Sequence, residues 1–110
     1  MTDARAPRTR RPARHEFPAI DEAGLVAARA ADRLLASAIA LGSERWAQFF
    51  ETFPDRLRDD EPAALRTTAL RARAVYGVKD SVRDVLPAEV TEPFLDALDR
   101  LIRELNRHRG

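Results

Sequence analysis

The sequence predicts an all-α fold, an elongated bundle of three to four helices. Two observations favour it: apolar residues keep one helical phase from Leu25 to Phe53, and the segment 91–107 repeats apolar residues at helical spacing. The composition agrees, because 45% apolar residues suit a folded domain and 34% charged residues suit a solvated helical surface. At 110 residues the chain is long enough for one domain with one modest core.

The longest predicted helix covers residues 21–53. Its apolar stripe, with Gly42 on the same line, consists of Leu25, Ala28, Leu35, Ile39, Trp46, Phe49 and Phe53. Asp21 is suited to cap its start, and Pro54 cannot continue its hydrogen-bond ladder. Gly42 and Ser43 are also a turn signal, but one internal glycine costs only about 1 kcal/mol relative to alanine. Because the stripe stays in phase, we expect one continuous helix, and a break at Gly42 is the alternative.

A turn at 54–58 should lead to a second helix over 61–76, with Pro62 in its first turn. One face of that helix carries Leu65, Ala69, Ala72 and Tyr76. Gly77 is expected to end it in the left-handed conformation.

A short helix over 80–86 should bury three apolar side chains before Pro87, namely Val82, Val85 and Leu86. The last helix is expected over 91–107, starting at Thr91 with Pro93 in its first turn. It has the most regular apolar face in the chain, made of Phe94, Leu95, Leu98, Leu101, Ile102 and Leu105.

The helix lengths favour a dimer. A helix over 21–53 would span roughly 50 Å at 1.5 Å per residue, more than the later helices cover along its whole length. A second copy of the chain would complete the thinly covered region, and homodimers are the commonest symmetric oligomers. We therefore expect a homo-oligomer, with a dimer favoured.

The first 16 residues are expected to form a disordered tail, and 17–110 a single helical domain. The tail holds two prolines, almost no apolar residue, and the arginines Arg5, Arg8, Arg10, Arg11 and Arg14. These arginines are a candidate contact for a polyanion, and a nucleic-acid-associated regulator is the alternative function. The rest of the chain has no basic bias, since residues 17–110 hold 14 basic and 16 acidic side chains.

Several classes of protein are excluded or disfavoured. The chain has no cysteine, which excludes disulfides, thiolate metal sites and thiol nucleophiles. It has no uncharged apolar run of about 18 residues, so no membrane span is expected. An apolar run does not follow the basic residues at the start, so we expect a cytoplasmic protein. The excess of arginine over lysine suggests a GC-rich bacterial genome.

No catalytic constellation, cofactor motif or metal site is visible. The acids Asp55, Asp59, Asp60 and Glu61 lie among arginines without a calcium-loop pattern, which favours a solvated loop. The histidines His15 and His108 lie near the chain ends, where surrounding structure rarely holds a catalytic base. We therefore expect a protein that is not an enzyme.

The densest apolar cluster is the candidate interface, and it consists of Trp46, Phe49, Phe50 and Phe53. It has three interpretations: simple core, an interface anchor, or an apolar ligand pocket between helices. The leading hypothesis for function is a small non-catalytic helical protein that acts by self-association or by binding a protein partner.

Overall fold

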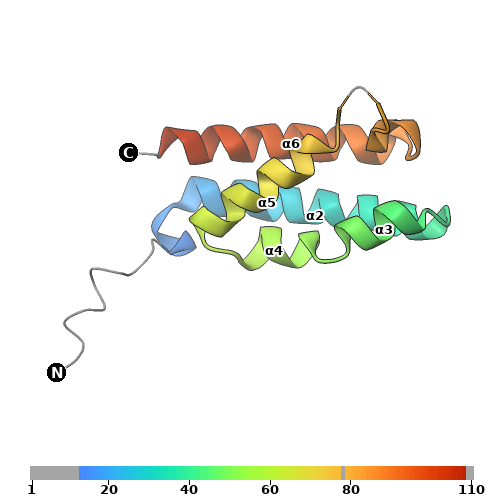
Figure 1. Ribbon diagram of the computed structural model, residues 1–110. Helices are drawn as coiled ribbons and strands as arrows, with labels where there is room; N and C mark the ends of the chain where they lie inside the picture. The colour runs from blue at the N-terminus through green and yellow to red at the C-terminus, as the bar shows by residue number, and fades with distance from the viewer. Residues whose placement is uncertain (1–12, 78, 109–110) are drawn as a thin grey trace.

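The computed structural model describes residues 13–77 and 79–108 (Figure 1). All regular elements in those ranges are helical, which confirms the all-α prediction. They are the one-turn 3-10 helices η2 (Arg14–Glu16) and η3 (Val82–Asp84), and the α-helices α2 (Pro18–Ala40), α3 (Glu44–Phe50), α4 (Phe53–Asp59), α5 (Pro62–Ala74) and α6 (Ala88–Arg107).

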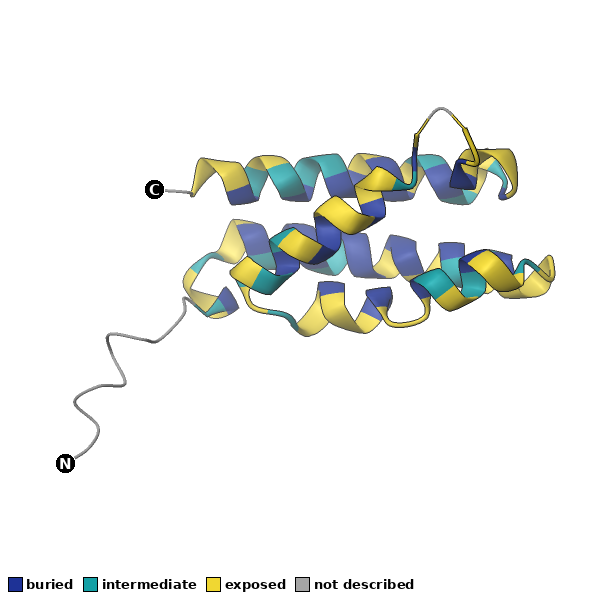
Figure 2. Ribbon diagram, viewed as in Figure 1, coloured by how far each residue is buried: buried dark blue, intermediate teal, exposed yellow. Residues whose placement is uncertain are grey.

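The helices form an elongated up-and-down bundle of 54 × 26 × 22 Å. α2 runs along the long axis of the bundle, α3 and α4 return along it, α5 crosses diagonally, and α6 runs antiparallel to α2 (Figure 1). α2 packs against α6, α4 and α3, and α5 packs against both α4 and α6. Each helix is buried on the face that it turns toward the other helices and exposed on the opposite face (Figure 2).

The expected continuous helix over 21–53 is wrong, because the chain breaks at Gly42. This glycine has a φ of +73°. The amide of Ser43 donates to the carbonyl of Ala38 at 2.9 Å, and the amide of Gly42 donates to that of Ile39 at 3.1 Å. This bond pair is a Schellman motif, which satisfies carbonyls at the end of α2. The alternative of a break at Gly42 is therefore the correct one.

A second break follows at Thr52, where the expected turn over 54–58 is replaced by α4. Pro54 lies in the first turn of α4 and does not end the preceding helix. Proline has no backbone N–H. It fits the first turn of a helix, where that N–H would have no intrahelical partner, and it equally fits just after a helix, where the hydrogen-bond ladder has ended. The stripe therefore spans three separate helices. The two breaks let α3 and α4 fold back along α2.

The buried face of α2 is displaced from the predicted stripe by one residue, about 100° around the helix. Four positions of α2 were expected inside. Ala28 is buried as expected, Leu25 and Leu35 are half-buried, and Ile39 is 64% exposed. The buried positions are mostly small: Ile20, Ala23, Gly24, Ala27, Ala28, Ala30, Ala31, Leu34 and Ala38. Alanine leaves room for neighbouring backbones to approach, so the small face packs inward.

The apolar faces of α5 and α6 agree with the sequence. The four residues predicted for the face of α5 are buried, as are all those predicted for α6 except Ile102, which is half-buried. The helix boundaries differ. α6 begins at Ala88, so Pro93 lies inside it and Thr91 is not its cap. The short helix over 80–86 is reduced to the single turn η3, and Val85 is exposed.

The expected left-handed stop at Gly77 is also wrong. Among the described glycines only Gly42 has a positive φ, and the left-handed residue of the α5–α6 connection is Asp80, with a φ of 52°. An aspartate tolerates this conformation better than most residues.

Order begins earlier than expected, because η2 covers residues that we assigned to the disordered tail. α2 starts at Pro18 with Phe17 as its N-cap, so Asp21 is not a cap. Asp21 instead binds Arg14. Residues 1–12 lie outside the described part of the chain.

Candidate functional site

The aromatic cluster lies inside a single chain. Trp46, Phe50 and Phe53 are 2% exposed or less, and Phe49 is half-buried. The ring of Phe50 contacts Phe53 and Phe94 edge-on, at centroid distances of 5.1 and 5.7 Å. Three of the four candidate interface residues are therefore core residues without a surface for a partner. Of the three interpretations, simple core is the one that their burial supports.

Arginines cover the outer edge of this cluster. The guanidinium of Arg71 lies 5.7 Å from the ring centre of Phe49 and 5.4 Å from that of Phe53. Arg45 lies 4.5 Å from the ring centre of Trp46. Such contacts stabilise by about 0.5–1 kcal/mol at exposed sites, and they give the cluster a charged outer surface. The indole Nε1 of Trp46 is buried and has no hydrogen-bond partner among the described residues.

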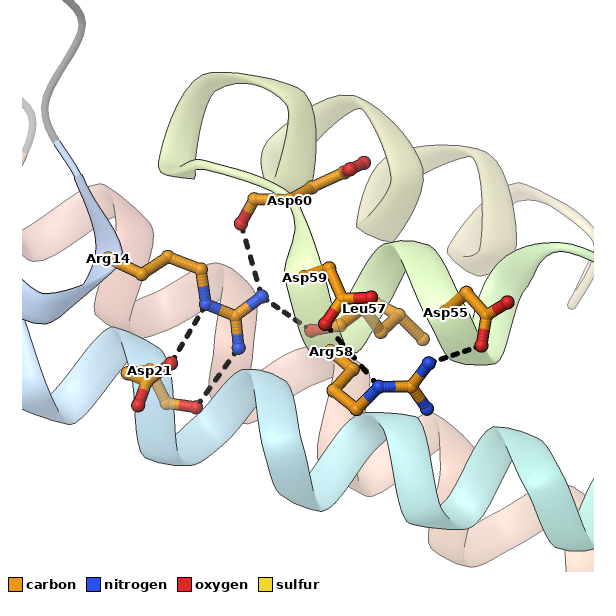
Figure 3. A network of polar contacts seen from close by, with 7 residues as sticks. All are labelled: Arg14, Asp21, Asp55, Leu57, Arg58, Asp59 and Asp60. Atoms are coloured by element: carbon orange, nitrogen blue, oxygen red, sulfur yellow. Dashed lines mark hydrogen bonds and ion pairs between the residues drawn. The ribbon is translucent and has the colours of Figure 1, made fainter.

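Only one of the five candidate polyanion contacts, Arg14, lies in the part of the chain that the structure describes. Arg5, Arg8, Arg10 and Arg11 lie outside the described residues. Arg14 is 7% exposed and is used internally (Figure 3). We therefore correct its assignment: Arg14 is a structural residue.

The Arg14 side chain joins α2 to the end of α4. Its Nε donates to Asp21 Oδ1 at 2.9 Å, and its Nη1 donates to the carbonyls of Leu57 and Asp60 at 2.7 and 3.1 Å (Figure 3). Its backbone amide donates to Glu61 Oε1 at 2.9 Å. The carbonyls at a helix C-terminus lack intrahelical partners and favour a cation, so Arg14 caps α4 from a distant part of the sequence. Nothing in the local pattern predicts this contact.

The acidic cluster around α4 is paired. Arg58 binds Asp55 and lies 3.4 Å from Asp59 (Figure 3). The hydrogen bond to Asp55 is the main cause that raises the pKa of Arg58 above its ordinary value. The Glu61 carboxylate accepts from the backbone amide of Arg14, whereas Asp60 contributes only its backbone carbonyl to the Arg14 contacts. In residues 13–77 and 79–108, no group of three or more His, Asp or Glu side chains is placed to hold a metal ion.

The connection between α5 and α6 is held by a second polar network. Tyr76 donates its hydroxyl hydrogen bond to the carbonyl of Thr91 at 2.6 Å, and burial raises its pKa above the ordinary value. Arg83 makes a two-fold contact with Glu92, at 2.9 and 2.8 Å. This contact lowers the pKa of Glu92 and raises that of Arg83. Ser81 and Asp84 form a capping box around η3.

The two most exposed large apolar residues of the described ranges lie where the sequence did not indicate a site. Ile39 and Leu41, at the α2–α3 turn, are 64% and 59% exposed. Ile39 also lines an apolar pocket of about 170 Å³, together with Ala38, Gly42, Ser43, Glu44 and Ala47. We call these exposed residues and this pocket the tip patch. The sequence did contain the signal, since a helix break at Gly42 leaves Ile39 and Leu41 at the end of the bundle.

A comparison of the chain with protein-family models, curated proteins and solved structures found no significant match in any of the three. Within the described ranges, each helix is too short or too polar to cross a membrane.

Proposed function

We propose that this protein is a non-catalytic helical module that acts by association, first with a second copy of itself, through the tip patch. The observation that carries the proposal is the exposure of Ile39, which lines an apolar pocket, and of Leu41 at the same turn. Single exposed apolar residues are common on monomeric proteins. Two of them at one turn, together with an apolar pocket, form a surface suited to contact with a partner.

The composition of the tip patch supports a second copy as the partner. A two-fold interface uses the same surface on both chains, so that surface must carry both the protruding and the receiving group. The tip patch has both, because Ile39 is exposed and also lines the pocket with Ala38 and Ala47, and Leu41 is exposed at the same turn. The patch is small, and small interfaces are typical of weak, transient complexes. We therefore expect a reversible dimer.

Sedimentation equilibrium over a wide range of protein concentration tests this proposal. The wild type should show concentration-dependent dimer mass, and Ile39→Glu or Leu41→Glu should remain monomeric with unchanged helicity. Leu70→Glu is the matched control, since Leu70 is 48% exposed on α5 and does not line the tip patch. A wild type that stays monomeric up to about 1 mM would exclude the proposal.

The alternative, a nucleic-acid-associated regulator, stays a prediction that depends on Arg5, Arg8, Arg10 and Arg11. Acidic side chains outnumber basic ones in the described ranges, and Arg73 pairs with Asp99 at 2.8 Å. Fluorescence anisotropy with a DNA duplex at low salt tests it, with a chain lacking residues 1–12 as control. Binding that falls steeply with salt and is lost on truncation would favour this alternative.

A further inference from the structure

A second pocket lies at the opposite end of the bundle from the tip patch. Its volume is about 140 Å³, it is open to solvent on one side, and its lining residues come from the start of α2, the segment just before it, the start of α5 and the end of α6. These helix ends lie together at one end of the bundle (Figure 1). Ile20 and Leu105 form an apolar floor and are 2% and 4% exposed, and the half-buried Phe17 forms one wall. A cavity of about 150 Å³ can hold one benzene ring, so this end pocket fits a small apolar group.

Arg66 supplies a positive charge at the wall of the end pocket. The residue is half-buried, and its Nη1 donates to Asn106 Oδ1 at 2.7 Å. Arg66 has no carboxylate within 4.0 Å in the part of the chain that the structure describes. Six other arginines of the same ranges have such a partner. One of them is Arg73, which lies about two turns after Arg66 in α5. The guanidinium fork of Arg66 therefore has donors available for an anion.

His108 and Ala63 complete the rim. The His108 ring packs against Phe17 at a centroid distance of 5.4 Å, which holds the imidazole at the edge of the pocket. Imidazole nitrogens add a second hydrogen-bond donor beside Arg66. Ala63 lies in the first turn of α5, so the positive end of that helix dipole lies at the pocket. It adds to the positive charge of Arg66.

We propose that the end pocket binds a small apolar carboxylate, that is, a free carboxylic acid on a short hydrocarbon chain or a single ring. The hydrocarbon part packs against Ile20 and Leu105, and the carboxylate accepts hydrogen bonds from Arg66. An arginine and a carboxylate match in planar geometry, and their charge-assisted hydrogen bonds are among the stronger ones in proteins. The small volume restricts the hydrocarbon part to about six carbons. The proposal is independent of self-association at the tip patch.

NMR titration of the full chain with sodium hexanoate tests the proposal. Amide signals from residues around the end pocket should shift saturably, with a Kd of about 0.1–10 mM, the range expected for a ligand this small. Hexanamide has the same hydrocarbon chain without the charge and should bind at least about tenfold more weakly. Hexylamine, with the opposite charge, should not bind.

Three variants locate the site. Arg66→Gln should weaken hexanoate binding at least about tenfold. Ala63→Leu should block the pocket from an exposed helix position, where a leucine does not disturb the core. Arg103→Gln is the matched control, because it removes an exposed arginine of α6 that does not line the pocket. Absence of saturable shifts up to about 50 mM hexanoate would overturn the proposal. Equal binding by Arg66→Gln, or of hexanamide, would overturn the assignment of the carboxylate to Arg66.

Discussion

The guanidinium of Arg14 occupies the space above Gly24. A Cβ atom at position 24 would lie 2.6 Å from Arg14 Nη2 and 3.0 Å from the carbonyl oxygen of Leu57. The side chain of Arg14, ten positions earlier, therefore favours a glycine at position 24 of α2. The same relationship fixes the distance between α2 and the end of α4, because Arg14 donates to that carbonyl.

Gly24→Ala should therefore destabilise the protein, by about 1–3 kcal/mol, although alanine is ordinarily the better residue within a helix. In an Arg14→Ala background the cost should fall, since only the contact with the Leu57 carbonyl remains. A double-mutant cycle in urea measures this coupling. Additive effects of the two substitutions would contradict the contact.

Phe50→Glu should prevent folding. Phe50 is fully buried against Phe53 and Phe94, and an unpaired carboxylate there has no partner or solvent. Far-ultraviolet circular dichroism should show loss of helicity. Phe50→Leu keeps the site apolar and should cost only about 1–3 kcal/mol. A folded, helical Phe50→Glu protein would show that this part of the core is accessible to solvent.

Gly42→Ala should destabilise by about 1–2 kcal/mol through backbone conformation alone. Its φ is +73°, and a Cβ there meets no atom within 4 Å. Gly42→Asn should cost less, because asparagine tolerates the left-handed region better. Gly77→Ala is the matched control and should stay within about 0.5 kcal/mol of wild type, since Gly77 has no positive φ. Chemical denaturation distinguishes the three variants, and equal costs at positions 42 and 77 would contradict the explanation.

The Arg83–Glu92 pair should make stability fall in acid. The hydrogen bond from Arg83 lowers the pKa of Glu92 below its ordinary value of 4.5. The contribution is therefore complete above pH 4.5 and is lost as the pH falls through the lower pKa of the folded state. The difference in thermal midpoint between wild type and Glu92→Gln should be constant near neutral pH and shrink below pH 4.5. A difference that does not change with pH would contradict this linkage.

The sequence predicted α5 and α6 well because large apolar residues mark their buried faces. Leu65, Leu98 and Leu101 recur at helical spacing, and each is fully buried. The prediction failed on α2 because we weighted Ile39 more than Ala38, whereas close helix packing favours the smaller side chain. Side-chain size alone does not identify the inner face of an alanine-rich helix.

The candidate sites were harder to predict than the fold. The end pocket and the Arg14 contacts join residues far apart in the sequence, and no local pattern encodes their distances. Arg14 and Leu57 are 43 positions apart, and Arg66 and Asn106 are 40 apart. Pro54 shows the related difficulty of a single signal with two meanings, since a proline suits a helix start as well as a helix stop.

The chain carries one tryptophan and one tyrosine, and each reports on a different part of the molecule. Trp46 is buried in α3, so its fluorescence follows the state of the aromatic cluster. Tyr76 is bound to the carbonyl of Thr91, so its ultraviolet absorbance follows the connection between α5 and α6. Coincident transitions of these two native probes would identify a single cooperative unit, whereas separate transitions would resolve the order in which the two parts open.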